Sequence, residues 1–152
     1  MDQDILGTST RSRQSNQRSI GSLMSIAEYR HSTLDCPDPV ALAKFYAELL
    51  GLKVEPLGDI PEDKVTWLRI QNDEGEPVIG FARIPDYVAP TWPVGPIPQQ
   101  THLEFSVTDL AKAEKEAIAI GATKHEFQSG ENYQVFLDPV GHPFCLILDY
   151  ND

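Results

Sequence analysis

Residues 31–38 read His31-Ser-Thr-Leu-Asp-Cys-Pro-Asp38, and residues 102–109 read His102-Leu-Glu-Phe-Ser-Val-Thr-Asp109. Each stretch runs from a histidine through an alternating pattern to an aspartate, and a helical pattern that ends at a glycine follows each one. A repeat with so long a period predicts two similar modules whose equivalent residues face a shared axis. His31 and His102 are such an equivalent pair.

The residues around the repeat predict the same order of elements twice. In the first copy Asp38 is placed to cap a helix, Pro39 suits its first position and Gly51 suits its end. Asp109 and Gly121 hold the corresponding positions in the second copy. We expect helices over residues 39–50 and 111–120, and strands over residues 29–35, 52–54, 66–70, 78–84, 103–107, 123–127, 133–137 and 143–148.

The repeat also predicts the domain organisation. We expect one domain over residues 28–150, made of modules at 28–84 and 101–150. Five prolines between residues 85 and 98 favour an extended connector at 85–100 and exclude a helix there. Residues 1–25 are polar and have no apolar period, so we expect a disordered tail.

Composition excludes several classes of function. The formal charge of −11 disfavours nucleic acid and anionic membrane surfaces as partners. No apolar run approaches the roughly 18 residues of a membrane-spanning helix, and the start lacks the apolar core of a secretory signal. The only cysteines are Cys36 and Cys145, too few for a disulfide framework, which favours the cytoplasm.

Strand alternation separates two faces of the predicted sheets. The apolar residues Leu34, Cys36, Leu103, Phe105 and Val107 should face the helices. The opposite face should carry His31, Thr33, Asp35, His102, Glu104 and Ser106, together with Trp67, Ile79, Phe81, Val135, Leu137, Cys145 and Ile147. This mixture of polar and apolar side chains suits a concave pocket. Simple exposure of the polar residues to solvent is the alternative.

Several short segments, in this order, resemble the vicinal oxygen chelate superfamily. They are the His31 to Asp38 spacing, Phe45-Tyr46 followed by Leu50-Gly51, Trp92-Pro93 before His102-Leu-Glu, Gly121-Ala122, and Asp138-Pro-Val-Gly-His-Pro-Phe-Cys145-Leu. The chain is most similar to the glyoxalase-like branch, which is grouped with bleomycin-resistance proteins and extradiol dioxygenases. The resemblance covers about residues 28–150.

The resemblance implies an α+β fold of two βαβββ modules whose sheets curl around a central cup, commonly in a homodimer. In metal-dependent members the first strand of each module supplies a histidine or comparable ligand, and the last strand supplies a glutamate or similar residue. Here the first-strand positions are His31 and His102, and the last-strand position of the second module is Cys145. Setting Gly75-Glu-Pro77 over Gly141-His-Pro143 puts Ile79 at the equivalent place in the first module.

This ligand set is incomplete for a hard divalent ion. Ile79 cannot bind a metal, and a thiolate would bias the remaining set of His31, His102 and Cys145 toward zinc. Glu104 shares a strand face with His102 and could replace a missing ligand, although two such close positions are poorly placed to converge on one ion. We therefore expect the isolated protein to carry less than one divalent ion per chain. The two histidines would then be hydrogen-bonded groups at the cup floor.

The expected cup binds a small organic molecule. Its lining is predicted to be His31, Thr33, Asp35, Trp67, Phe81, His102, Glu104 and Cys145, with Trp92 near its mouth. Glu104 and Asp35 are the candidates for a general base, with solvation or pairing to Arg69 or Arg83 as the alternative. A cysteine such as Cys145 is more often a small buried apolar residue than a ligand or nucleophile.

Three functions follow from this cup. The favoured one is a metal-free cup that binds a small, partly aromatic molecule, for sequestration or for catalysis. The second is a divalent-metal-dependent enzyme, a glyoxalase-like lyase or isomerase or a dioxygenase-type enzyme, and the third is a non-catalytic interaction domain. The residues alone leave open whether the protein is an enzyme, since one fold carries many functions.

Overall fold

A computed structural model of the chain describes residues 26–149, so the expected tail at 1–25 lies outside the described residues. The elements are β1 (Ser32–Cys36), α1 (Pro39–Leu50), β2 (Lys53–Val54), a 3₁₀ helix η1 (Glu62–Lys64), β3 (Trp67–Gln71), β4 (Pro77–Arg83), β5 (Leu103–Val107), α2 (Leu110–Ala119), β6 (Thr123–Lys124), β7 (Tyr133–Leu137) and β8 (Pro143–Leu148). The predicted α+β fold of two βαβββ modules is confirmed. None of the helices among residues 26–149 is both long enough and apolar enough to cross a bilayer.

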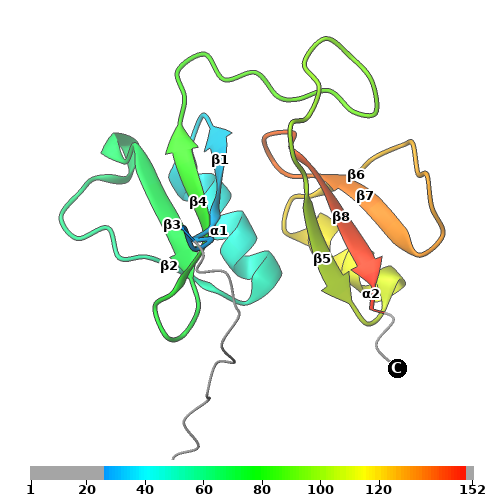
Figure 1. Ribbon diagram of the computed structural model, residues 1–152, viewed down its shortest axis with the longest axis horizontal. Coiled ribbons are helices and arrows are strands. Elements are labelled where there is room, and N and C mark those ends of the chain that lie inside the picture. The colour runs from blue at the N-terminus through cyan, green and yellow to red at the C-terminus, as the bar shows by residue number, and fades with distance from the viewer. Residues whose placement is uncertain (1–25, 150–152) are drawn as a thin grey trace, which may run out of the picture.

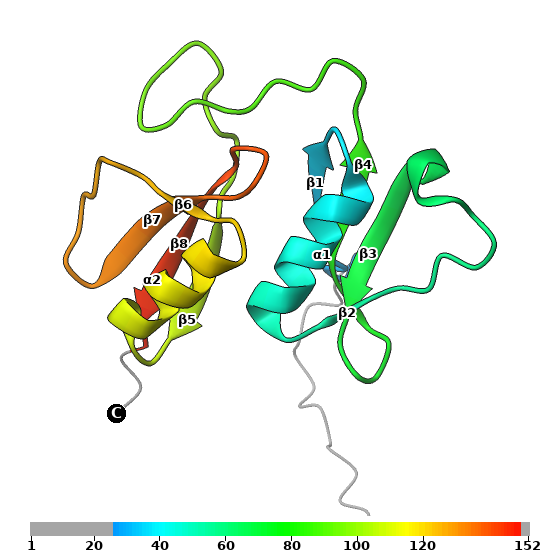
Figure 2. The ribbon, with the colours of Figure 1, turned by 180° about the vertical axis from the view of Figure 1, so that it is seen from behind.

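Each module forms one four-stranded mixed sheet. The strand orders are β1-β4-β3-β2 and β5-β8-β7-β6, with the first strand of each module parallel to the last and the other pairs antiparallel. The sheets lie side by side with β1 and β5 as their inner edges (Figure 1). Seen from behind, α1 and α2 cover the same side of the molecule (Figure 2). The opposite, helix-free faces of the two sheets are the sides on which a cup was predicted.

The boundaries of α1 follow from its capping residues. The Asp38 carboxylate accepts hydrogen bonds from the backbone N–H groups of Val40 and Ala41 at 3.1 and 3.3 Å. Gly51 ends the helix in the left-handed region with φ of 65°, which glycine adopts without the penalty that a Cβ atom brings. These two residues fix the direction in which the chain leaves β1 and returns to β2.

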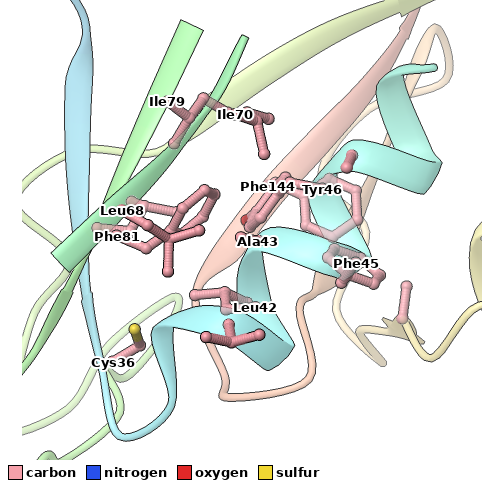
Figure 3. Packing of buried hydrophobic residues seen from close by; sticks show 14 of the residues in the cluster. Cys36, Leu42, Ala43, Phe45, Tyr46, Leu68, Ile70, Ile79, Phe81 and Phe144 are labelled. Atoms are coloured by element: carbon pink, nitrogen blue, oxygen red, sulfur yellow. The ribbon is translucent and has the colours of Figure 1, made fainter. Parts of the chain in front are cut away.

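Helix α1 joins the two modules in one core. Phe45 and Tyr46 pack with Phe144 of β8 at ring-centroid distances of 6.2 and 6.4 Å (Figure 3). The Tyr46 ring also lies 6.2 Å from that of Phe105 of β5. Most of the buried hydrophobic residues form one cluster that includes residues of both sheets. The position of the second sheet is therefore set by α1 of the first module.

A buried polar network reinforces the same contact. The side chain of Asp138, in the β7–β8 turn, accepts a hydrogen bond from the Tyr46 hydroxyl at 3.0 Å and pairs with Nδ1 of His142 at 2.7 Å. Nε2 of His142 lies 3.1 Å from the hydroxyl of Tyr87 in the connector. The network thus ties α1, the turn and the connector together. Burial, with the charge of Asp138, raises the pKa of Tyr46 well above its ordinary value.

Two residues predicted on the helix-free face lie on the other side. Phe81 is fully buried and stacks on Tyr46 at 5.7 Å, and Ile79 is also buried on the helix side. The reason is a β-bulge, because Ile70 pairs with Ile79 while Gln71 pairs with Pro77. The bulge adds one residue to β4, so the side chains after it point to the face opposite the one predicted by counting from the turn at Gly75. Phe81 therefore does not line a cup.

The buried thiol of Cys36 makes stability sensitive to alkaline pH. Burial above all, and then the charge of Asp38, raise its pKa from 9.0 to about 11. The folded state thus favours the neutral thiol, so this contribution is complete below pH 9 and is lost as the pH rises to about 11. We expect the unfolding free energy of the wild type to fall by about 2 kcal/mol more than that of Cys36→Ala over this range.

Urea denaturation of both proteins at matched pH values measures this difference. The comparison with Cys36→Ala isolates the part of the pH dependence that requires the thiol. Parallel curves for the two proteins would show that ionisation of Cys36 does not limit stability.

Candidate functional site

A pocket of about 310 Å³ lies on the helix-free face of the second sheet. Its lining consists of Trp92, Gln99, His102, Glu104, Ser129, Tyr133, Val135, Pro143, Cys145 and Ile147. Strand pairing sets Glu104 beside Cys145 and Cys145 beside Val135, so these side chains project from one face. The predicted alternation is correct for these residues of the second module.

Three side chains that can bind a proton or a metal ion meet in this pocket. Nε2 of His102 lies 3.2 Å from Oε1 of Glu104. The donor atoms of these two residues and Sγ of Cys145 all lie within 4.8 Å of one another. The His102 and Glu104 side chains are 39% and 58% exposed, whereas Cys145 is buried. A molecule that enters from solvent therefore meets the imidazole and the carboxylate first.

The two arginines considered as alternative partners of Glu104 and Asp35 pair with other groups. Arg69 pairs with Glu55 at 3.0 Å, and the Arg83 guanidinium donates to the backbone carbonyls of Val65 and Pro37. Glu104 is therefore bound to His102 rather than to a strong cation. It remains available to accept a hydrogen bond or a proton from a ligand.

Cys145 is poorly suited to act as a nucleophile. Burial raises the pKa of its thiol, and the negative charge of Glu104 raises it further. The thiolate is the reactive form, and these surroundings disfavour it at neutral pH. In the absence of a metal ion Cys145 thus supplies a small apolar surface to the pocket wall.

Gln99 supplies an acceptor that the sequence analysis does not identify. Its Oε1 atom is buried and has no hydrogen-bond partner among residues 26–149. Leaving a buried acceptor unpaired costs about 1–3 kcal/mol, which a donor group on a ligand would offset. Gln99 lies in the connector, where no periodic pattern marks a direction for the side chain.

Aromatic side chains form part of the pocket wall. The Trp92 ring packs edge-on against His125 at 4.9 Å and lies 5.5 Å from Phe127. Tyr133 lies opposite Ile147 in the β7–β8 pair, and its hydroxyl is 2.6 Å from Oγ of Ser129. The alternation that places Val135 on this face could also have identified Tyr133.

The match to a family model decides the classification. Residues 31–147 match the model described as the glyoxalase-like domain, which is most of the chain. The chain belongs to the glyoxalase-like domain family. The match confirms the resemblance to the vicinal oxygen chelate superfamily. No curated protein matches the sequence significantly.

Solved structures of other glyoxalase-like proteins share the fold. A glyoxalase/bleomycin resistance protein/dioxygenase family enzyme from Burkholderia phytofirmans is 19% identical, with a TM-score of 0.56 over 80% of this chain and 98% of that one. A glyoxylase/bleomycin resistance protein/dioxygenase domain from a Frankia species is 20% identical, with a TM-score of 0.56 over 84% of this chain and 95% of that one. Identities this low support the fold alone.

The two modules of this glyoxalase-like domain do not contribute equally to the pocket. His31, Thr33, Asp35 and Trp67 belong to the first module and are not among the residues that line it. The His31 and Trp67 rings lie 6.1 Å apart, so these two do face each other. Of the residues predicted to line the cup, the pocket therefore brings together only those of the second module and the connector, which are His102, Glu104, Cys145 and Trp92.

The first module also lacks a ligand on its last strand. Thr33 pairs with Gly80, just as Glu104 pairs with Cys145, so Gly80 and not Ile79 is the equivalent of Cys145. A Cβ atom at Gly80 would lie 2.7 Å from Oγ1 of Thr33. The correction follows from the bulge in β4, which shifts the alignment by one residue.

The second-module cluster fits a zinc ion. Zinc accepts nitrogen, oxygen and sulfur ligands, and His102, Glu104 and Cys145 offer one of each within 4.8 Å of one another. In such a site Glu104 would take the place expected for His31. The donor atoms of Glu104 and His102 do lie close together, although their neighbouring positions along the strand made this doubtful. A zinc ion held by these residues would act as a Lewis acid toward a substrate oxygen.

Proposed function

We propose that the second-module pocket binds a small, partly aromatic organic molecule that carries hydrogen-bond donors. The observation that carries this proposal is that Gln99, whose buried Oε1 atom is unpaired among the described residues, lines the same pocket as Glu104. Trp92, Val135 and Ile147 offer the apolar surface against which a ring can pack.

The charge of the pocket narrows the ligand class. Neither lysine nor arginine is present among its lining residues, and Glu104 is the carboxylate that faces a ligand. A carboxylate or phosphate ligand would therefore find no lysine or arginine partner among the lining residues. Neutral molecules with amide, phenol or aniline donors fit these groups best.

Calorimetric titration of such molecules tests the proposal. We expect Gln99→Ala and Glu104→Gln each to weaken the binding of an aryl amide by about tenfold, because each change removes one acceptor in a partly dry pocket. Gln100→Ala is the matched control, since Gln100 is exposed and bonds only to the Pro98 carbonyl among described residues. Equal affinities in all four proteins would place the binding elsewhere and favour an interaction domain.

A zinc-dependent enzyme is the second candidate, and the convergence of His102, Glu104 and Cys145 supports it. Elemental analysis of protein purified without chelator or metal-affinity resin distinguishes the two. The metal-free function predicts clearly less than one divalent ion per chain and a melting temperature that a chelator leaves unchanged. Stoichiometric zinc that is lost in Cys145→Ala would instead support the enzyme, because binding metal requires the deprotonated thiol.

A further inference from the structure

A second and larger hollow lies on the opposite side of the molecule from the proposed ligand pocket. This inter-helix groove has a volume of about 420 Å³ and runs between α1 and α2, the two helices seen side by side in Figure 2. Its floor is formed by Phe105 and Val107 of β5 and Leu146 of β8. Leu49 and Ile120 contribute to its walls. The groove is large enough for a small organic molecule and mostly apolar.

Two carboxylates lie on facing elements of the groove. Glu48 comes from the last turn of α1, and its side chain has no hydrogen bond or ion pair among residues 26–149. Glu116 comes from α2, and its ion-pair partner among those residues is Lys112 on the same helix, at 3.9 Å. A contact this long at an exposed site contributes little. Both carboxylates are therefore available to a ligand.

The helix ends add further negative potential. Leu50 and Ile120 both line the groove, so the C-terminal ends of α1 and α2 meet there. The C-terminus of a helix carries a partial negative charge, and neither helix has a basic residue in its last turn. No lysine or arginine belongs to the lining, although Lys112 borders an adjoining hollow. The charges of this site thus favour a cation and repel an anion.

We propose that the inter-helix groove binds a small amphipathic organic cation. The apolar body of the ligand packs on Phe105, Val107 and Leu146, and its protonated amine is directed to the carboxylates of Glu48 and Glu116. This site is separate from the second-module pocket, because the sheet lies between them and the two share no lining residue. The inference therefore does not depend on the proposed function.

Titration of the ¹⁵N-labelled full-length protein tests the proposal. The probe is 1-naphthylmethylammonium, and 1-naphthylacetate is its counterpart of opposite charge. We expect saturable amide shifts from the cation at Val107, Ala113 and Ile120, with at least about tenfold weaker binding of the anion. Glu48→Gln/Glu116→Gln should weaken binding of the cation at least about fivefold.

Two further variants distinguish binding of the cation in the groove from a general effect of net charge. Glu74→Gln/Glu131→Gln changes the net charge equally at exposed residues away from the groove, and we expect it to leave affinity unchanged. Ala113 is a partly buried residue of α2 that lines the groove, so Ala113→Leu should fill the groove and reduce binding. Absence of saturable shifts, shifts confined to Val135 and Cys145, equal binding of the anion, or an equal loss in the control variant would each overturn the proposal.

Discussion

Asp138→Ala is expected to lower the free energy of unfolding by about 3–5 kcal/mol. The Asp138 carboxylate accepts hydrogen bonds from the backbone N–H groups of Val140 and His142. It also accepts one from the Tyr46 hydroxyl and pairs with the His142 ring. Among the described residues, Asp138 is the charged residue whose side chain is buried, at 4% exposure. Removing it leaves several donors unpaired in the contact between the two modules. Urea denaturation at neutral pH measures the loss.

Asp73→Ala provides the control for Asp138→Ala. Asp73 also forms an ion pair, with Lys53 at 2.7 Å, but the two side chains are 81% and 69% exposed. Surface pairs of this kind contribute about 0–1 kcal/mol, so we expect little change. Equal losses in the two variants would show that the network around Asp138 does not hold the modules together.

Phe144→Ala is expected to destabilise the protein by about 3–5 kcal/mol, as deletion of a large buried side chain usually does. Phe144 is fully buried, and its ring lies 5.7 Å from Phe136 and 5.9 Å from Phe105 within its own sheet. It also contacts Phe45 and Tyr46 of the first module. The variant should therefore lose packing on both sides of the module contact.

Val94→Ala is the matched control for Phe144→Ala, since Val94 is 84% exposed and should change stability by less than about 0.5 kcal/mol. Thermal and urea unfolding followed by near-ultraviolet circular dichroism give both values. A loss below about 1 kcal/mol in Phe144→Ala would mean that the two modules do not share a core.

The elements were predictable where the chain carries local signals. The capping residue Asp38 and the terminal glycine Gly51 fix both ends of α1, and its predicted and observed bounds coincide. Helix α2 begins and ends one residue earlier than predicted. Strands β5, β7 and β8 also match residue for residue, because turn residues bound their alternating patterns. The start of β1 differs, since Tyr29 to His31 continue the alternation without pairing to β4.

The errors have a common physical origin in register. Because of the bulge opposite Ile70 and Gln71, Phe81 lies in the core and not in the predicted cup. For the same reason the equivalent of Cys145 is Gly80 and not Ile79. A bulge adds one residue without leaving a clear mark in composition. The face of a strand beyond a bulge therefore cannot be counted from the turn alone.

The candidate site was predictable only within one module. Alternation along β5 was enough to place His102 and Glu104 on the same face as Cys145. The relation of His31 to His102 depends instead on how α1 packs against the second sheet, through contacts such as Tyr46 with Phe105. These contacts join residues far apart in the chain, and a single sequence holds no signal for them.

The emission of Trp92 tests the second-module ligand site most directly. In a Trp67→Phe variant, Trp92 is the remaining tryptophan of the chain, and it lines the pocket. A non-absorbing amide ligand should change its emission with the same dissociation constant that calorimetry gives, and Gln99→Ala should weaken both by about tenfold. Calorimetric binding that leaves the emission of Trp92 unchanged, and that is insensitive to Gln99→Ala, would contradict this assignment.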